Sequence, residues 1–324
     1  MRLAYIITAH KNPEQLARLV ARLDVEGASF FVHIDKRTDA QLYGRMVESL
    51  RQRPNVNFLT KRFPCNYMTL FGAVQAVVQA IDEIFRQKIS FDYLIYLSGQ
   101  DYPIKTNAQI QMTLREANGF SFLSYLPLPF DGTHPTAGRV IQNMTRIECW
   151  HLHVFGRYVR VPLRGGSLPA RVANAFMPAK RRFPSGFKPY GGWAYWCLSR
   201  RHVQYVHDFV RSTPAFLRFF RYVKSADEIF LQTILLNSPY RNEVINNDLR
   251  YVDWSTEDCH PKILAEEDFP KLLDSSNLFA RKFDLPTAPK VLDMIDAQIL
   301  DLHPSPAGIA TTSPSHSAAV SHGV

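Results

Sequence analysis

The sequence predicts an α/β protein built on a mostly parallel sheet with helices on its faces. Over the first hundred residues, short runs rich in β-branched and aromatic residues alternate with amphipathic segments. This alternation is typical of parallel strands joined by helices. Hydrophobic residues make up 46% and aromatic residues 12% of the 324 positions, which is enough for a large buried core.

Each element is predicted from the period of its apolar residues. Strands are expected where short apolar runs carry β-branched or aromatic side chains, at Leu3–Thr8, Phe30–Ile34, Val56–Leu59 and Tyr93–Leu97. Helices are expected where apolar residues recur at helical spacing, at Pro13–Leu23, Ala40–Leu50, Val74–Phe85 and Ala226–Leu236.

The rest of the chain predicts one domain with an insertion and a tail. Residues 126–190 are rich in Pro and Gly and show no regular period, so we expect an irregular insertion there. Residues 303–324 consist mostly of Ser, Ala, Pro, Thr and His and contain no Lys, Arg, Asp or Glu, which predicts a disordered tail. The domain is therefore expected to cover residues 1–302.

The positive charge is concentrated in one stretch. The formal net charge is +9, yet residues 149–207 contain no acidic residue and carry ten of the 38 basic ones. The remainder of the chain therefore sums to −1. A uniformly basic protein that coats nucleic acid is excluded by this distribution, and we expect no nucleic-acid partner.

Other features predict a cytoplasmic protein. No apolar run reaches the roughly 18 residues that a membrane span requires, and the N-terminal run Leu3–Ile7 leads into polar residues without the pattern of a signal peptide. The four cysteines are widely spaced, which favours reduced thiols.

Polar residues follow the predicted strands at the edge where parallel sheets bind ligands. The groups are Thr8–His10, His33–Arg37 and Ser98–Pro103. Further along, Ser225 and Glu228 have the spacing of a capping box, which gives Glu228 a purely structural explanation.

Several motifs are missing from the sequence. It contains no GxGxxG, no GxxxxGK[ST] and no Asp-x-Asp. A diphosphate ligand would therefore be neutralised by side-chain cations or helix N-termini. The alternating Cys149, His151 and His153 resemble a half-exposed strand face more than a metal site, so no metal site is expected.

Seven segments, taken in order, resemble glycosyltransferase family 14. They read HIDKR, LSGQDYPIKTN, GGWAYWCLSR, SADEIFLQTILLNSP, NNDLRYVDW, CHPK and LFARKFD. The family contains core-2/I-branching β-1,6-N-acetylglucosaminyltransferases and peptide O-xylosyltransferases. The resemblance covers about residues 3 to 290, and the last four segments are closer to the xylosyltransferase branch.

The resemblance implies a GT-A-type, Rossmann-like fold and an inverting, metal-independent glycosyltransferase that uses a UDP-sugar. Glu228 matches the family's general base, and Lys262, Arg281 and Lys282 match its diphosphate-binding positions. The remaining donor-binding matches are Thr8, His10, Asp35, Lys36, Thr69, Phe71, Ala194, Tyr195 and His260. Asp101 and Trp193 are expected to line the donor or acceptor pocket.

The resemblance leaves the substrates open. Trp193 stands where the family usually has Ser, and Ala194-Tyr195 replace the Asp-Trp of xylosyltransferases, so the donor is xylose or N-acetylglucosamine. The acceptor is a glycan, a peptide or a lipid-linked molecule. The basic stretch 149–207 is interpreted as an acceptor-side patch or a patch for an anionic membrane surface. The alternatives are a β-1,6-N-acetylglucosaminyltransferase of a bacterial-type glycan and a non-catalytic protein that binds nucleotide sugars or glycans.

Overall fold

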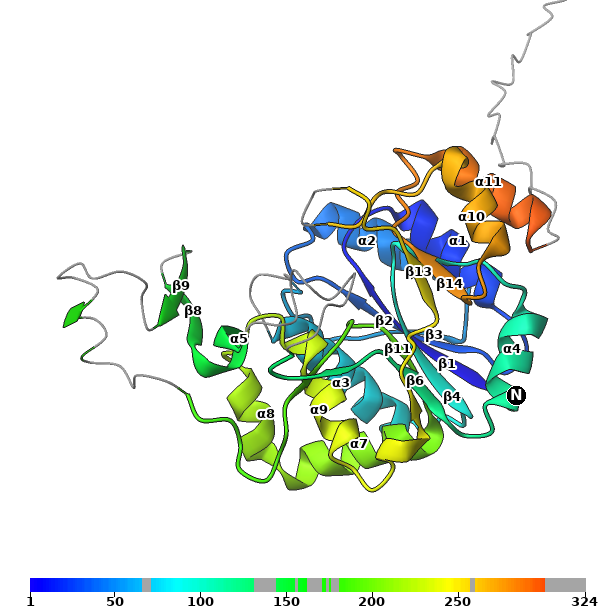
Figure 1. Ribbon diagram of the computed structural model, residues 1–324. Helices are drawn as coiled ribbons and strands as arrows, with labels where there is room; N and C mark the ends of the chain where they lie inside the picture. Colours follow the sequence, from blue (N-terminus) through cyan, green and yellow to red (C-terminus); the bar gives the residue numbers. More distant parts are fainter. Residues whose placement is uncertain are drawn as a thin grey trace, which may run out of the picture.

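The computed structural model confirms the predicted α/β class (Figure 1). It describes residues 1–65, 71–130, 144–154, 157–161, 171–172, 175, 181–256 and 260–300. The strands are β1 (Leu3–Ala9), β2 (Ser29–Ile34), β3 (Val56–Phe58), β4 (Tyr93–Ser98), β5 (Asp101–Pro103), β6 (Ser121–Leu123), β7 (Leu126–Pro127), β8 (Trp150–Val154), β9 (Arg157–Val161), β10 (Tyr190–Gly191), β11 (Trp196–Ser199), β12 (Val244–Ile245), β13 (Arg250–Val252) and β14 (Phe279–Arg281).

The α-helices cover both faces of the sheet. They are α1 (Pro13–Leu23), α2 (Ala40–Glu48), α3 (Gly72–Arg86), α4 (Asn107–Glu116), α5 (Thr145–Glu148), α7 (Arg200–Ser212), α8 (Pro214–Phe220), α9 (Phe230–Leu236), α10 (Phe269–Asp274) and α11 (Pro289–Gln298). Short 3₁₀ helices are η1 (Ala226–Glu228), η2 (Arg241–Glu243) and η3 (Glu266–Asp268).

The central sheet has seven strands in the order β12-β6-β11-β4-β1-β2-β3. The strands β4, β1, β2 and β3 run parallel, as the alternation of strands and helices predicts. The strand β11 runs antiparallel to both of its neighbours, β4 and β6. A smaller sheet in the order β13-β14-β5 starts where β4 ends, because β5 follows β4 after two residues.

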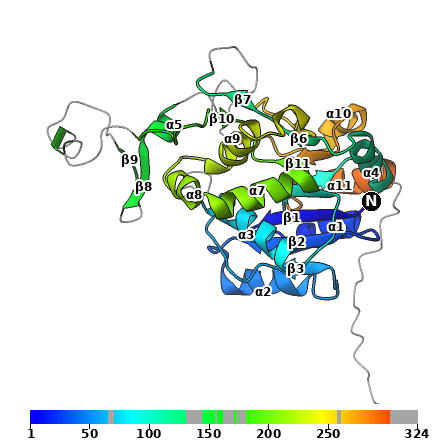
Figure 2. The ribbon, with the colours of Figure 1, turned by 90° about the horizontal axis from the view of Figure 1, so that it is seen from below.

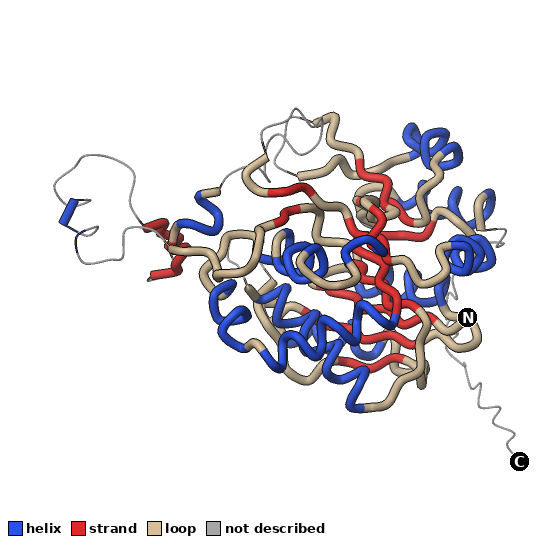
Figure 3. The backbone as a smooth tube through the Cα atoms, turned by 60° about the horizontal axis from the view of Figure 1, so that its bottom comes forward, coloured by secondary structure: helices blue, strands red, loops and turns tan. Residues whose placement is uncertain are grey.

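Alternate strand residues pack into two hydrophobic cores. Tyr5 and Ile7 point to the face covered by α1, α4 and α11, whereas Ala4 and Ile6 point to the face covered by α3, α7, α8 and α9. Figures 2 and 3 show the strands running between these two layers of helices. This arrangement explains why the strand sequences are apolar throughout, since both faces are buried.

The first three helices begin and end within two residues of the predicted positions, whereas the helix predicted near Glu228 does not form as one element. The helix α1 has the predicted bounds, while α2 ends two residues early and α3 starts two residues early. The helix predicted at Ala226–Leu236 is divided into η1 and α9. The tail 303–324 and much of the insertion lie outside the described residues.

The predicted capping box at Ser225 is wrong. An N-cap residue needs an extended backbone so that its side chain reaches the third amide of the helix. Ser225 is left-handed, with φ 47°, and its side chain makes no capping hydrogen bond. Glu228 therefore does not have the capping role that its spacing predicts.

No described helix has the length and apolar character needed to cross a membrane.

Two glycine substitutions should change stability in opposite directions. A Cβ on Gly192 would lie 1.9 Å from the carbonyl oxygen of Ser124, whereas a Cβ on Gly44 in α2 would meet nothing within 4 Å. We expect Gly192→Ala to lower the free energy of unfolding by roughly 1–3 kcal/mol through overpacking. Gly44→Ala should raise it by about 0.5–1 kcal/mol because alanine favours the helix. Urea unfolding of both variants checks the pair, and an unchanged midpoint for Gly192→Ala would contradict the close approach.

Candidate functional site

The carboxyl ends of β1, β2 and β4 lie side by side, because Thr8 is in register with both His33 and Ser98. The Thr8 hydroxyl is 3.2 Å from the hydroxyl of Tyr96. His10 is exposed just beyond β1. The structure thus brings the three groups of polar residues that follow the predicted strands to one edge of the sheet, where open α/β sheets bind ligands.

Asp35 is a buried carboxylate at the end of β2, whereas the adjacent Lys36 is exposed. It accepts hydrogen bonds from the Arg37 amide at 2.8 Å, the Arg37 guanidinium at 2.8 Å and the Cys65 amide at 2.9 Å. Burial alone would raise its pKa, but these hydrogen bonds outweigh burial and lower the pKa. Asp35 is therefore a fixed anion, held in place by its own loop and by the one after β3.

His33 holds that second loop in place. The Phe63 amide donates a hydrogen bond to His33 Nε2 at 2.9 Å, so the imidazole accepts there as a neutral ring. Burial lowers the pKa of His33 to about 4, although the charge of Asp35 opposes the shift. The loop that carries Cys65 against Asp35 thus depends on an uncharged His33.

Two stacked tyrosines join β4 to the segment before β11. The rings of Tyr96 and Tyr195 stack with their centroids 5.5 Å apart. The Arg281 guanidinium lies 4.3 Å from the centre of the Tyr195 ring, a distance at which a cation is attracted to an aromatic face. Burial raises the pKa of Tyr195 to about 12. Ala194 and Tyr195 are thereby held close to the predicted cation Arg281.

Asp101 and Arg281 face each other where β5 pairs with β14. Asp101 is fully buried, and its Oδ2 accepts a hydrogen bond of 2.6 Å from the Ser98 amide. Its Oδ1 lies 3.5 Å from Arg281 Nε, and both atoms are buried without a hydrogen-bond partner within the described chain. Burial raises the pKa of Asp101, while Arg281 opposes the shift. Incompletely satisfied polar atoms of this kind are common at ligand sites.

Positive charge gathers around Lys282. Burial lowers the pKa of Lys282, and the charges of Lys11 and then Arg281 lower it further. Partial desolvation by neighbouring groups, and then the charge of Lys11, also lower the pKa of His10, although its side chain keeps contact with solvent. Asp284 is 2.9 Å from the Lys11 ammonium and offsets part of this charge. Closely spaced cations that raise one another's energy in this way would be stabilised by an anion such as a diphosphate.

Lys262, the third predicted cation, is paired with nearby carboxylates. Its ammonium lies 2.7 Å from Asp268 and 3.3 Å from Glu267. Its backbone is near the cation cluster, since the Leu264 amide donates to the Lys282 carbonyl at 2.8 Å. The charge of Lys262 is thus compensated locally, and His260, two residues earlier, is exposed.

Trp193 contributes to a flat aromatic surface. Its indole stacks on that of Trp254, with centroids 5.1 Å apart and an interplanar angle of 18°. Gln232 of α9 donates a hydrogen bond to the Trp193 carbonyl at 2.8 Å. Amphipathic rings of this size suit the apolar face of a sugar or a base. The sequence prediction did not include Trp254, although it ends the NNDLRYVDW segment.

Glu228 ends η1 with its side chain 18% exposed, and its Oε2 lies 2.7 Å from the Arg146 guanidinium. The Gly192 amide donates a hydrogen bond to the Glu228 carbonyl at 2.8 Å. Arg146 belongs to α5, 82 residues earlier in the chain. No local pattern marks Arg146 as a partner of Glu228, so the sequence prediction missed it.

Asp227 adds a second carboxylate beside Glu228. Burial raises its pKa, and the negative charge of Glu228 raises it further. Together with Tyr96 and Ala194, Asp227 lines a small cavity of about 10 Å³, which is close to the room that one water molecule needs. The cavity thus lies between Asp227, the neighbour of Glu228, and Tyr96 of the central sheet.

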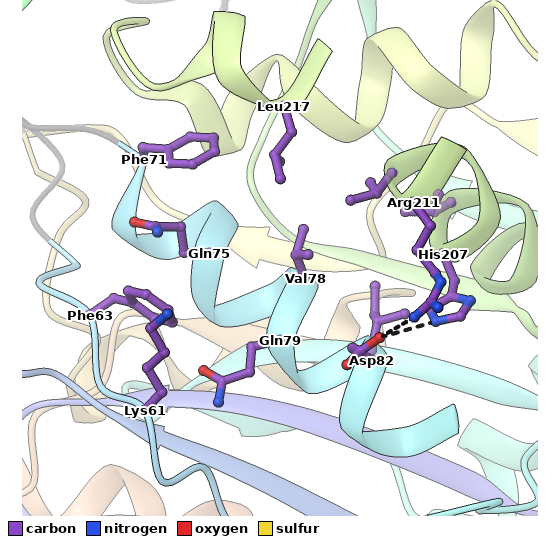
Figure 4. Close-up of a pocket in the computed structure, with 13 residues that line it drawn as sticks. Lys61, Phe63, Phe71, Gln75, Val78, Gln79, Asp82, His207, Arg211 and Leu217 are labelled. Carbon is purple, nitrogen blue, oxygen red and sulfur yellow. Dashed lines mark hydrogen bonds and ion pairs between the residues drawn. The ribbon is translucent and has the colours of Figure 1, made fainter. Parts of the chain in front are cut away.

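A larger groove of about 330 Å³ lies between α3 and α7 (Figure 4). Apolar side chains such as Val78 and Leu217 line it, and Asp82 forms ion pairs with Arg211 and His207 at one end. Among the predicted site residues that the structure describes, Phe71 is the one that lines this groove. Thr69 lies outside the described residues.

The described cations of the basic stretch 149–207 serve different purposes. Arg181 is buried and stacks on the ring of Phe219 at 3.9 Å. Arg201 forms a 2.8 Å ion pair with Glu243. The exposed cations are Arg171, Arg182, Lys188, Arg200 and Arg201. In the same region His151 bonds to the Tyr158 hydroxyl and the Thr145 carbonyl, as expected for a structural residue.

The fold and the site together indicate a class of protein. A mostly parallel sheet of seven strands carries polar side chains at the carboxyl ends of β1, β2 and β4, and a stack of Tyr96, Tyr195 and Arg281 joins β4 to the small sheet. This arrangement is consistent with the GT-A-like fold that the sequence predicts.

Comparison with known proteins identifies the family. The model of the Core-2/I-Branching enzyme family matches residues 3–273. The chain is 25% identical over 312 residues to Xylosyltransferase oxt of Drosophila pseudoobscura pseudoobscura, covering 88% of this chain and 32% of that protein. It is 28% identical over 314 residues to Beta-glucuronosyltransferase GlcAT14B of Arabidopsis thaliana, covering 92% and 66% respectively. It is 23% identical over 330 residues to human Xylosyltransferase 1, covering 94% and 31%.

The chain therefore belongs to the Core-2/I-Branching enzyme family, glycosyltransferase family 14, as its seven segments predict. It spans about a third of the length of the xylosyltransferases that it matches.

Acid should destabilise the protein through His33. Its folded pKa of about 4 lies below the ordinary value of 6.5. The unfolded chain therefore binds more protons between these values, and stability falls as the pH drops from about 6.5 to 4. The full contribution of His33 would be roughly 3 kcal/mol. We expect His33→Gln to flatten the dependence of the free energy of unfolding on pH over this range. The exposed His153→Gln variant is the control, and equal slopes for the two variants would contradict the prediction.

Proposed function

We propose that the protein is an inverting, metal-independent glycosyltransferase that moves a sugar from a UDP-sugar to an acceptor hydroxyl and forms a β linkage. Family membership supports the reaction class. Two observations support the proposal. Glu228 is partly exposed, and its neighbour Asp227 lines a small cavity with Tyr96. Tyr96 in turn stacks on Tyr195, the ring that the Arg281 guanidinium covers. Direct displacement of a diphosphate requires a base for the acceptor hydroxyl and cations for the leaving group.

The reaction would be a single in-line displacement. Glu228 takes the proton from the acceptor hydroxyl, and the hydroxyl oxygen attacks the anomeric carbon opposite the leaving group. The bond from that carbon to the diphosphate breaks, and UDP leaves with the electron pair. A positioned general base contributes about 10²–10⁴-fold to such a step.

Arg281 and Lys282 would stabilise the charge that develops on the leaving diphosphate. An Arg guanidinium suits this role because its planar fork can bind two phosphate oxygens. Lys262, the third predicted cation, is compensated by Asp268. It would have to leave that partner to reach a ligand, so we assign the main role to the adjacent pair.

The donor is best sought among three UDP-sugars. Xylose follows from the names of the animal relatives, N-acetylglucosamine from the branching enzymes of the family, and glucuronic acid from the name of the Arabidopsis relative. Ala194 and Tyr195 provide no carboxylate for a sugar hydroxyl.

The acceptor is proposed to be a glycan, a peptide or a lipid-linked molecule, with no nucleic acid involved. The exposed Arg182, Lys188 and Arg200 would meet an anionic acceptor or an anionic membrane surface. The buried Arg181 is removed from this surface. A cytoplasmic location, peripheral to the inner membrane, would suit a lipid-linked acceptor.

Replacing the base should abolish transfer and spare binding. We expect Glu228→Gln to lower kcat by about 10²–10⁴-fold, while UDP binds within about threefold of wild type. Transfer kinetics and isothermal titration with UDP provide the two measurements. The control is Glu243→Gln, which also removes a glutamate paired with an arginine but lies outside the site. Near-normal turnover of Glu228→Gln would remove Glu228 from the base role.

Metal removal should leave activity unchanged. UDP release from UDP-xylose, UDP-N-acetylglucosamine and UDP-glucuronic acid is measured with excess EDTA and with added manganese. We expect one donor to give turnover at least tenfold above the others. Its turnover should be the same with EDTA and with manganese, because side-chain cations stabilise the leaving group. Activity that vanishes in EDTA and returns with manganese would contradict the metal-independent mechanism. Binding of UDP without turnover of any donor would favour the non-catalytic alternative.

A further inference from the structure

The helix α5, which belongs to the insertion, is hydrogen-bonded to the segment that leads to Glu228. Arg146 of α5 is only 4% exposed. Its guanidinium donates hydrogen bonds to the Lys224 carbonyl at 3.1 Å and to the Ser225 carbonyl at 2.8 Å. The same nitrogen that binds the Ser225 carbonyl donates to Glu228 Oε2 at 2.7 Å. One buried cation thus bonds both the backbone before η1 and the carboxylate at its end.

A second buried arginine anchors the insertion without reaching Glu228. Arg181 donates to the Phe219 carbonyl and stacks on the rings of Phe219 and Trp150, at 3.9 and 4.8 Å. The His151 amide donates to the Tyr222 carbonyl at 3.2 Å. The insertion is therefore held to the segment before η1 at several points. Arg146 differs from these other anchors because its guanidinium also reaches the carboxylate.

We infer that Arg146 is a positioning residue, which holds Glu228 in the orientation that accepts the acceptor proton. The inference rests on the proposed function of Glu228 as the base. A guanidinium fixed by two carbonyl groups presents its remaining donors in a defined direction. Oε2 is engaged by Arg146, so Oε1 is the oxygen left for the acceptor hydroxyl.

The local backbone explains why an external partner is needed. Ser225 is left-handed and does not cap η1, so no capping box orients the Glu228 side chain. Asp227 lies directly beside Glu228 and repels its negative charge. Arg146 compensates this repulsion from the opposite segment. The insertion thereby supplies a residue to the site and couples the irregular region to the chemistry.

The contact and its role are tested separately. A double-mutant cycle of Arg146→Gln, Glu228→Gln and the double variant measures the coupling in the unfolding equilibrium constant, which requires no substrate. We expect at least a tenfold coupling. Kinetics of Arg146→Gln should show kcat lowered by roughly 10–10²-fold, the cost of a misplaced catalytic group. The donor KM should stay within about threefold. Arg146→Lys, or added guanidinium ions with Arg146→Ala, should recover part of kcat.

Arg181→Gln is the matched control, because it removes the other buried anchor of the insertion. It should lower the unfolding midpoint while kcat stays within about threefold of wild type. Equal losses of kcat in Arg146→Gln and Arg181→Gln would show a merely structural role and overturn the inference. Wild-type kcat in Arg146→Gln, with Glu228→Gln inactive, would overturn the inference and leave the proposed function intact. An active Glu228→Gln would instead refute the proposed base.

Discussion

The arrangement of the site depends on the stack formed by Tyr96, Tyr195 and Arg281. Tyr96 belongs to the central sheet, Tyr195 precedes the antiparallel strand β11, and Arg281 ends β14 of the small sheet. The stack therefore joins the two sheets at the carboxyl edge. Burial of the guanidinium is tolerable because the Tyr195 face lies on one side and the Asp101 carboxylate is 3.5 Å away. The stack thereby adds to the pairing of β14 with β5, which also holds the cation cluster beside the strand ends.

The charge distribution and the site chemistry concern different parts of the chain. The net charge of +9 comes from residues 149–207, yet the cations at the carboxyl edge include Lys11, Arg281 and Lys282, outside that stretch. Two arginines of the insertion region, Arg146 and Arg181, are buried and anchor the backbone. Charge counted along a sequence is thus a poor guide to which cations reach the surface, because some of them are buried or paired with carboxylates.

The strands and helices of the first hundred residues were predictable because each apolar period reports burial on one or two faces. The edge of the site was predictable too, since parallel strands in register end together. The capping box at Ser225 was not, because a left-handed backbone at one residue cancels a pattern that spacing alone suggests. The ion pair between Lys262 and Asp268 was not predicted from the sequence either. The path of the short segment between these two residues determines which carboxylate the ammonium contacts.

The sequence by itself determined the fold class and the family, because seven ordered segments and alternating periods carry that information locally. Only the tertiary structure decided the partners of these residues. Arg146 meets Glu228 from 82 residues away, Trp254 stacks on Trp193, and Arg281 faces Asp101 through pairing of β14 with β5. Such contacts arise from how distant segments pack, and no spacing along the chain encodes the distance between them.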